Sequence, residues 1–269
     1  MILHATARGE GAPVALLHGL YGQSGNFATV QRRLAAGGRR VLALDLRNHG
    51  ASPHAPAMGY PDMAEDVLET LRAAGVLPCA LIGHSMGGKV AMWAALAAPA
   101  AVARLLVADI APVAYAHATE HGDYLAALAA LDLRPGLTRA AADAALAARV
   151  PDAKVRGFLL QNFVPGDPPR WRIDLAAIAA ALPQLVGWPE HVTGRYDGPT
   201  LFLSGARSDY VRPEHRPAIR ALFPHARFAT LRDAGHWLHA DDPDGFVAAA
   251  AAFLAAGEAP CPRVTPGGG

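Results

Sequence analysis

The sequence predicts a fold of the α/β class, in which a mostly parallel central sheet is flanked by helices. Short apolar segments alternate with longer helix-like segments along most of the chain. Such apolar segments are typical of parallel strands that helices cover on both faces. Hydrophobic residues make up 52% of the 269 residues and charged residues 17%, so the chain can bury the core that this fold requires.

The expected elements follow one another in a regular order. The segments expected to be strands are short and apolar for most of their length: 14–17, 41–46, 79–82, 105–110, 200–203 and 227–231. Longer segments with helical patterns lie between or after them: 25–36, 61–74, 86–98, 212–222 and 243–255. Pro61 and Pro243 lie in the first turn of their helices, where a missing backbone N–H costs little.

One long segment interrupts this alternation. Residues 113–197 are rich in Ala and Leu, are broken by Pro and Gly, and contain no convincing strand. Because the segment is too long for a simple connection, we expect a helical cap over the strand ends, with extra helices stacked on the sheet as the alternative. Residues 1–112 and 198–257 then form the core domain, and residues 258–269 form a flexible tail.

Charge and composition narrow the choice of partners and location. The 24 Lys and Arg residues nearly balance the 23 Asp and Glu residues, so we expect no nucleic-acid partner. We also expect no membrane span, because no apolar run approaches the ~20 residues that cross a bilayer. Cys79 lies in an apolar run and Cys261 in the tail, which predicts no disulfide framework. These features favour a cytoplasmic protein, and they leave its oligomeric state unknown.

The string Gly83-His84-Ser85-Met86-Gly87 has the form G-x-S-x-G and lies between an apolar strand and an Ala-rich helix. In this context it predicts a tight turn that lifts the serine hydroxyl above the sheet, with glycines where a side chain would not fit. The helix that follows directs its first N–H groups toward the same place. Ser85 is therefore the candidate nucleophile, and an ordinary glycine-rich turn is the alternative.

A serine hydroxyl needs an adjacent base to act as a nucleophile. We expect this base to be His236, in the loop before the last helix, because the chain order Ser, Asp, His is typical of serine hydrolases on such a sheet. His84 is expected to have a structural role. The histidines expected in solvated loops or on polar helix faces are His49, His54, His117, His121, His215 and His225.

Two aspartates are candidates for the acid that orients His236. Asp109 ends the fourth predicted strand, and Asp209 follows the fifth. In most hydrolases of this design the acid stands three residues after a strand-ending glycine, but that position here is Ser208. Because a shift of one residue can turn a side chain away, we favour Asp109 and keep Asp209 as the alternative. The aspartate that is not used is expected to cap a helix or bond within a loop.

The oxyanion of an acyl-transfer reaction needs two hydrogen-bond donors. We expect one to be the backbone N–H of Met86, directly after the nucleophile. The string His18-Gly19-Leu20-Tyr21-Gly22 follows the first predicted strand, and its glycine lets the backbone approach closely. The backbone N–H of Leu20 is the second expected donor.

Several stretches together carry a specific resemblance to a known family. They are His18-Gly19-Leu20-Tyr21-Gly22, Asp45-Leu46-Arg47-Asn48-His49-Gly50, Gly83-His84-Ser85-Met86-Gly87-Gly88-Lys89, Asp109-Ile110-Ala111-Pro112-Val113 and Gly235-His236-Trp237. The sequence resembles the α/β-hydrolase superfamily, and more closely the YbfF-type serine esterases and related animal α/β-hydrolase domain proteins. The resemblance implies an α/β-hydrolase fold, Asp109 as the acid of the triad, and an accessory position near the histidine for Ser208.

The resemblance also implies a reaction and a substrate class. We expect a serine hydrolase that cleaves short-chain acyl esters or thioesters through an acyl-enzyme on Ser85, with no metal or organic cofactor. The expected partner is therefore a small-molecule ester or thioester. A carbon–carbon bond hydrolase of the same fold is the enzymatic alternative, in which Arg156, Arg170 or Arg172 would hold a substrate carboxylate. A catalytically silent binding protein with this fold is the other alternative.

Overall fold

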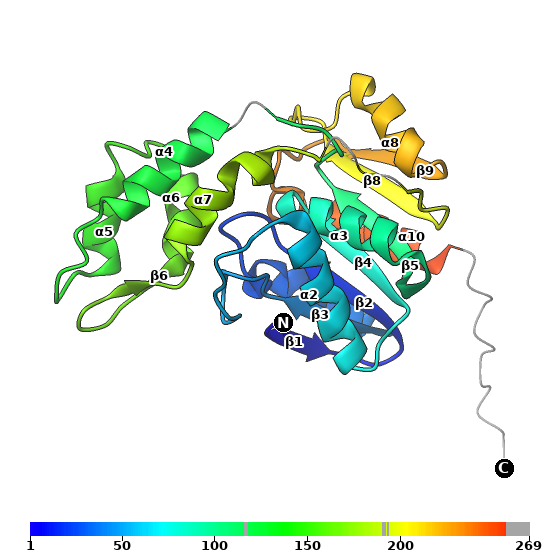
Figure 1. Ribbon diagram of the computed structural model, residues 1–269, viewed down its shortest axis with the longest axis horizontal. Helices are drawn as coiled ribbons and strands as arrows, with labels where there is room; N and C mark the ends of the chain where they lie inside the picture. The colour runs from blue at the N-terminus through cyan, green and yellow to red at the C-terminus, as the bar shows by residue number, and fades with distance from the viewer. Residues whose placement is uncertain (116–117, 190–191, 193, 257–269) are drawn as a thin grey trace, which may run out of the picture.

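The computed structural model describes residues 1–115, 118–189, 192 and 194–256. Over these residues a seven-stranded sheet forms the centre of the molecule, in the order β1-β3-β2-β4-β5-β8-β9 (Figure 1). The strands are β1 (Ala5–Arg8), β2 (Ala12–Leu17), β3 (Arg39–Leu44), β4 (Cys79–His84), β5 (Val102–Ala108), β8 (Thr200–Gly205) and β9 (Ala226–Leu231). Because β1 runs antiparallel to β3 and the other neighbouring pairs are parallel, the predicted mostly parallel sheet is confirmed.

Helices cover both faces of this sheet. Those that belong to the sheet domain are α1 (Ala28–Ala36), α2 (Tyr60–Ala73), α3 (Met86–Ala97), α8 (Arg216–Leu222), α9 (Leu238–Asp241) and α10 (Pro243–Ala255). Alternate residues of β4 point to opposite faces: Leu81 packs in the cluster that contains Val90 of α3, and Ile82 in the cluster that contains Phe246 of α10. All residues of β4 are buried, which explains its continuously apolar sequence.

The strands end where the candidate site begins. The predicted strands are present, but β3 and β5 end earlier than the expected segments 41–46 and 105–110. Asp45 and Asp109 therefore lie just beyond the carboxyl ends of their strands rather than within them. In parallel sheets these ends meet at one edge, which is the usual place for a ligand site.

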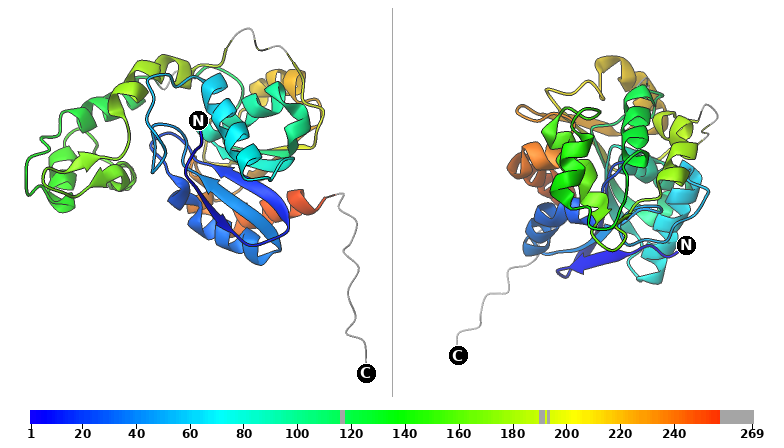
Figure 2. Two further views of the ribbon diagram at one scale, coloured as in Figure 1. Left: turned by 60° about the horizontal axis from the view of Figure 1, so that its bottom comes forward. Right: turned by 90° about the vertical axis from the view of Figure 1, so that its left-hand side faces the viewer.

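The segment between β5 and β8 forms a helical insertion. It contains α4 (Ala118–Ala129), α5 (Arg139–Leu146), α6 (Ala153–Leu159), α7 (Leu175–Val186) and a short hairpin of β6 (Phe163–Val164) and β7 (Arg170–Trp171). Figures 1 and 2 show this insertion, in green, to one side of the sheet. The expectation of no strand here is wrong, because a pair of two-residue strands is too short to show a periodic pattern. The boundaries given above for the core and the cap stay a prediction.

Other expectations differ from the structure in detail. The edge strand β1 was not expected, and the short 3₁₀ turns Ser24–Phe27 and Pro213–His215 precede α1 and α8 where continuous helices were expected. The expected tail, residues 258–269 with Cys261, lies outside the described residues. Over the ranges described, none of the helices has both the length and the apolar character needed to cross a bilayer.

Candidate active site

Ser85 occupies the sharp turn between β4 and α3. Its backbone has φ 51° and ψ −119°, a conformation that L residues rarely adopt. Two glycines permit this turn. A Cβ atom at Gly83 would lie 2.2 Å from the carbonyl oxygen of Gly87, and one at Gly87 would lie 2.3 Å from that of Leu17. The structure thus has the strained strand-to-helix turn that the G-x-S-x-G string predicts.

His236 lies between Ser85 and Asp109. It follows β9, in the loop before α9. Its Nε2 is 3.1 Å from Oγ of Ser85, and its Nδ1 is 2.8 Å from Oδ2 of Asp109. Because an ionised carboxylate only accepts hydrogen bonds, Nδ1 carries the proton and Nε2 is free to accept the proton of the serine. The fold therefore brings these three residues into one hydrogen-bonded chain, although His236 and Ser85 are 151 positions apart in the sequence.

Asp109 is held in place by several donors. Its side chain is fully buried, and its backbone has φ 52°. Oδ1 accepts a hydrogen bond of 3.1 Å from the backbone N–H of Gly205, and Oδ2 accepts one from the hydroxyl of Ser208. These donors satisfy the buried carboxylate, which holds His236 in one orientation through Nδ1. The structure thus places Ser208 beside the acid, next to His236.

Asp209 is turned away from this group. Its carboxylate is exposed and forms an ion pair of 2.7 Å with Arg212, within the loop that leads to α8. Asp209 comes one position after Ser208, whose hydroxyl bonds to Asp109. At this next position the side chain meets Arg212 instead. Its ion pair with Arg212 is a contact within this loop.

His84 packs against His236, and His239 packs against His84. The ring of His84 is 4.8 Å from the ring of His236 and 4.8 Å from that of His239, centroid to centroid. Nε2 of His84 donates a hydrogen bond of 2.7 Å to the backbone carbonyl of His236, which fixes the loop that carries the candidate base. Burial lowers the pKa of His84 well below its usual value and lowers the pKa of His239 to about 4. Both rings are therefore neutral at neutral pH, and His84 has the structural role that was expected.

The loop after β2 lies opposite the start of α3. The backbone N–H of Tyr21 donates a hydrogen bond of 3.2 Å to Nε2 of His49, which pins this loop to the segment after β3. His49 is fully buried, and burial lowers its pKa to about 3, so the expectation that it is solvated is wrong. Within the described part of the chain, the backbone N–H groups of Leu20 and Met86 donate no hydrogen bond. Both remain available to a ligand beside Ser85.

Tyr210 is a site residue that sequence reasoning missed. Its ring stacks on the ring of His236, with centroids 3.9 Å apart and planes 19° apart. The backbone carbonyl of Tyr210 accepts a hydrogen bond of 2.6 Å from the hydroxyl of Tyr115. The contact joins the loops after β8 and β9, and no local string in the sequence indicates it.

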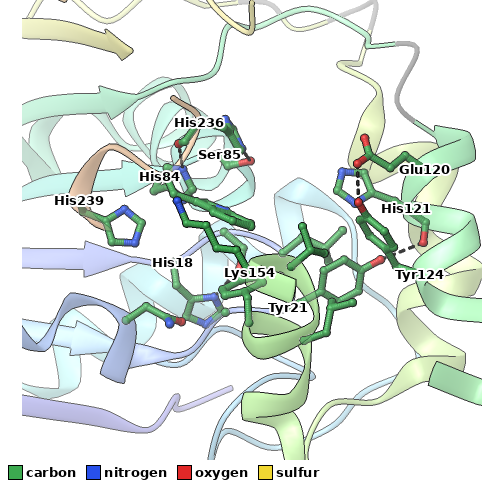
Figure 3. Close-up of a pocket in the computed structure, with 18 of the residues that line it drawn as sticks. His18, Tyr21, His84, Ser85, Glu120, His121, Tyr124, Lys154, His236 and His239 are labelled. Atoms are coloured by element: carbon green, nitrogen blue, oxygen red, sulfur yellow. Dashed lines mark hydrogen bonds between the residues drawn. The ribbon is translucent and has the colours of Figure 1, made fainter. Parts of the chain in front are cut away.

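A cavity of about 390 Å³ lies in front of Ser85, between the sheet domain and the insertion. Figure 3 shows Ser85 and His236 on one side of it, with Glu120 and Tyr124 of α4 on the other. His121 lines this cavity and is partly buried, so the expectation of a solvated side chain is wrong for it too. His117, which was expected to be solvated as well, lies outside the described residues.

The insertion is joined to the sheet domain beside His236. Nζ of Lys154, on α6, is 2.5 Å from Oδ1 of Asp241 and 5.0 Å from the centre of the Trp237 ring. The ring of Phe158, one turn further along α6, is 5.3 Å from the ring of Trp237. These contacts close one wall of the cavity with residues from both parts of the chain.

Over the part of the chain that the structure describes, neither a metal-binding cluster nor the three cap arginines named above are found at this cavity. In the described ranges, no cluster of three His, Cys, Asp or Glu side chains has a geometry suited to a metal ion. Arg156 pairs with Asp143, with 3.1 Å between Nε and Oδ1. Neither Arg156 nor Arg170 or Arg172 is among the residues that line the cavity. The expected counter-charge for a substrate carboxylate is thus not placed there.

Comparisons with known proteins extend over both the sheet domain and the insertion. The model of a family described as "alpha/beta hydrolase fold" matches residues 12–243. The sn-1-specific diacylglycerol lipase ABHD11 of Mus musculus is 42% identical over 248 residues, which cover 90% of this chain and 80% of the lipase. Esterase YbfF of Escherichia coli (strain K12) is 37% identical over 243 residues, covering 90% of this chain and 93% of the esterase. Among solved structures, a marine microorganism esterase has a TM-score of 0.90 at 36% identity and covers 94% of this chain and 99% of its own.

Proposed function

The chain belongs to the α/β-hydrolase family, and we propose that it is a serine esterase that forms an acyl-enzyme on Ser85. Family membership confirms the resemblance carried by the sequence strings. The names of the relatives, esterase and lipase, support ester hydrolysis as the reaction. The observation that carries the proposal is the hydrogen-bonded chain from Ser85 through His236 to Asp109.

The proposed reaction begins with proton transfer from Ser85 to His236. Nε2 of His236 takes the hydroxyl proton as Oγ attacks the carbonyl carbon of the ester. Asp109 stabilises the imidazolium that forms, because its buried carboxylate accepts from Nδ1. His236 then gives the proton to the leaving alcohol oxygen, and the acyl group stays on Ser85. A water molecule, deprotonated by the same histidine, releases the acid and restores the serine.

The oxyanion of the tetrahedral intermediate would be held by the backbone N–H groups of Leu20 and Met86. Support for this assignment is that neither group has an acceptor among the residues described, while the neighbouring N–H of Tyr21 is engaged by His49. Each such donor contributes on the order of 10²–10³ in rate when it is aimed at the developing charge.

The proposed substrates are small-molecule esters, with short-chain acyl esters or thioesters as the finer assignment. A cavity of about 390 Å³ falls within the range that holds small organic ligands. The alternative of carbon–carbon bond hydrolysis is weakened, because the arginines that would hold its carboxylate lie away from the cavity. The alternative of a silent binding protein is weakened because the serine, histidine and aspartate of the candidate triad are all present and hydrogen-bonded.

The experiment that tests this function is hydrolysis of p-nitrophenyl acetate and butyrate by the purified protein. Ser85→Ala should lower kcat by a factor on the order of 10⁶, while Ser204→Ala, on β8 and outside the cavity lining, should keep wild-type turnover. A fluorophosphonate should label the wild-type protein, with the adduct on the peptide that contains Ser85. Equal turnover by Ser85→Ala, or an adduct on another residue, would contradict the proposal.

A further inference from the structure

A second, smaller cavity meets the candidate nucleophile. Its volume is about 30 Å³, against about 390 Å³ for the large cavity, and Ser85 lines both. Leu20, His121 and Tyr210 also line both, so they stand where the two cavities adjoin. The side chains that line only the smaller cavity include Tyr60, Met86, Lys89, Ile110, Leu185 and Val186. The nucleophile is therefore flanked by two spaces of very different size.

Lys89 lines the smaller cavity but has no donor left for a ligand. Its side chain is buried, and its Nζ donates hydrogen bonds to the backbone carbonyls of Val113 at 3.0 Å, Val186 at 3.3 Å and Gly187 at 2.5 Å. An ammonium group has three hydrogens, and these carbonyls account for all of them. The group therefore offers its methylenes, and not its charge, to the cavity.

Two of the tyrosine hydroxyls around this cavity are engaged in the same way. The hydroxyl of Tyr60 donates to the backbone carbonyl of Leu185, and that of Tyr115 donates to the carbonyl of Tyr210. The remaining walls include the aliphatic side chains of Ile110 and Leu185. An apolar group gains by burial against these walls, and the polar side chain of His121 stands on the side shared with the large cavity.

The catalytic groups differ in the cavity that they face. His236 lines only the large cavity, and Met86 lines only the smaller one. In the proposed reaction, Nε2 of His236 must reach the leaving alcohol oxygen, which places the alcohol on the large side. The carbonyl oxygen must reach the backbone N–H of Met86, which turns the acyl carbon toward the smaller side.

We infer that the acyl group of the substrate enters the smaller cavity, closed by Leu185 and Val186 of α7, while the alcohol occupies the large cavity. This inference rests on the proposed function, since it assigns the two halves of the ester in that reaction. It predicts an esterase that is selective for the acyl group and tolerant of the alcohol.

The volumes set the size of each half. A cavity needs ~10–15 Å³ to hold one water molecule, so about 30 Å³ holds two or three groups of methylene size. The acyl group is therefore uncharged and short, such as acetyl or propionyl. The large cavity has more than ten times that space, and its lining includes the polar side chains of Glu120 and Lys154. It suits a bulky alcohol with polar groups.

The test measures kcat/KM on two series of esters. The acyl series consists of p-nitrophenyl acetate, butyrate, hexanoate and octanoate, and the alcohol series consists of acetates of ethyl, benzyl and naphthyl alcohols. For the wild-type protein we expect kcat/KM to fall at least tenfold from butyrate to octanoate, because one misfitting methylene in a closed pocket changes the rate by about 10-fold or more. Across the acetates we expect no comparable fall with increasing alcohol size.

Variants identify which cavity limits the acyl group. Leu185→Ala and Val186→Ala enlarge the smaller cavity from different positions, so at least one remains usable if the other does not fold. For each variant, the ratio of kcat/KM for hexanoate to kcat/KM for acetate should be about ten times the wild-type ratio. Phe158→Ala is the matched control, because Phe158 lines only the large cavity and should leave the ratio of acyl chain lengths unchanged.

The outcomes separate this inference from the proposed function. If Ser85-dependent hydrolysis persists but turnover does not depend on acyl length, the assignment of the acyl group is wrong while the esterase stands. The assignment is reversed if Phe158→Ala, and neither α7 variant, extends the acyl range. If the wild-type protein hydrolyses none of the esters, the proposed function itself fails.

Discussion

The ring of Tyr210 lies flat against the ring of His236, with centroids 3.9 Å apart and planes 19° apart. One edge of the imidazole already bonds to Asp109 and the other approaches Ser85. These two hydrogen bonds still allow the ring to rotate about the axis through Nδ1 and Nε2. They therefore fix the orientation of the ring only in part. The stacked tyrosine restricts that rotation, so we interpret Tyr210 as a positioning residue for the base.

This contact predicts different effects for two substitutions at Tyr210. Tyr210→Phe keeps the stacked ring and should retain kcat within a few-fold of wild type. Tyr210→Ala removes the ring and should lower kcat about tenfold, since stacked rings stabilise a pair by about 0.5–1.5 kcal/mol. Steady-state kinetics on p-nitrophenyl acetate measure both. A loss of kcat in the phenylalanine variant as large as in the alanine variant would contradict the positioning role.

The two aspartates also predict opposite outcomes. Asp109→Asn keeps the shape of the side chain but no longer favours the proton on Nδ1 of His236, so kcat should fall by a factor on the order of 10⁴. Asp209→Asn weakens an exposed ion pair with Arg212, away from the bonds of His236, and should leave kcat unchanged. Asp209→Asn should also unfold at a temperature close to that of wild type, since its side chain is exposed. A collapse of kcat in Asp209→Asn alone would transfer the acid role to that residue.

Burial of His239 predicts a loss of stability in acid. Burial lowers its pKa to about 4 in the folded protein, against about 6.5 when it is unfolded. Between these values the unfolded chain binds the extra proton, so the free energy of unfolding falls as the pH is lowered from about 6.5 toward 4. His239→Gln removes the titrating side chain and with it this part of the pH dependence of the free energy of unfolding. Denaturant unfolding of both proteins at pH 7 and pH 5 should show a decrease that is larger in wild type by about 2 kcal/mol. Equal decreases would show that His239 is not responsible.

The turn around Ser85 predicts a strong dependence on its glycines. A Cβ atom at Gly87 would meet the backbone carbonyl of Leu17 at 2.3 Å, and backbone cannot move aside cheaply. Gly87→Ala should therefore lower the free energy of unfolding by at least about 2 kcal/mol, and activity should fall with it. Gly157→Ala, in α6 with open space around its Cβ position, should instead raise stability by about 0.5–1 kcal/mol. Thermal unfolding of the pair measures the contrast, and a Gly87→Ala variant as stable as wild type would refute it.

The central strands could be predicted because their burial on both faces leaves a signal in the sequence itself. β4 and its neighbours β2 and β5 are mostly apolar, and the glycines around Ser85 mark the turn that follows. The edge strand β1 leaves no such signal, since most of its residues are exposed and its pairing depends on β3. The hairpin of β6 and β7 could not be predicted either, because a strand of two residues is too short to show alternating hydrophobicity.

In the candidate site, residues within sequence strings could be predicted, and residues defined by packing could not. Ser85 and His236 belong to short strings with a known chain order, which is why both could be named. Tyr210 meets His236 only because two loops converge above the sheet. Lys89 stands in an Ala-rich helix where a lysine normally faces solvent, and only the fold shows that three carbonyls surround it. His49 was misjudged for the same reason.

The hydrogen bonds of Lys89 have a consequence for how such a protein can be re-engineered. One amino group holds Val113, just after β5, and Gly187, just after α7. Lys89 of α3 thus ties together the two ends of the helical part of the insertion. A chimaera that keeps Lys89 and these carbonyls is therefore expected to keep both ends of an exchanged segment attached to α3. Because the exchanged segment also supplies walls of both cavities, we expect its replacement to alter the substrate range.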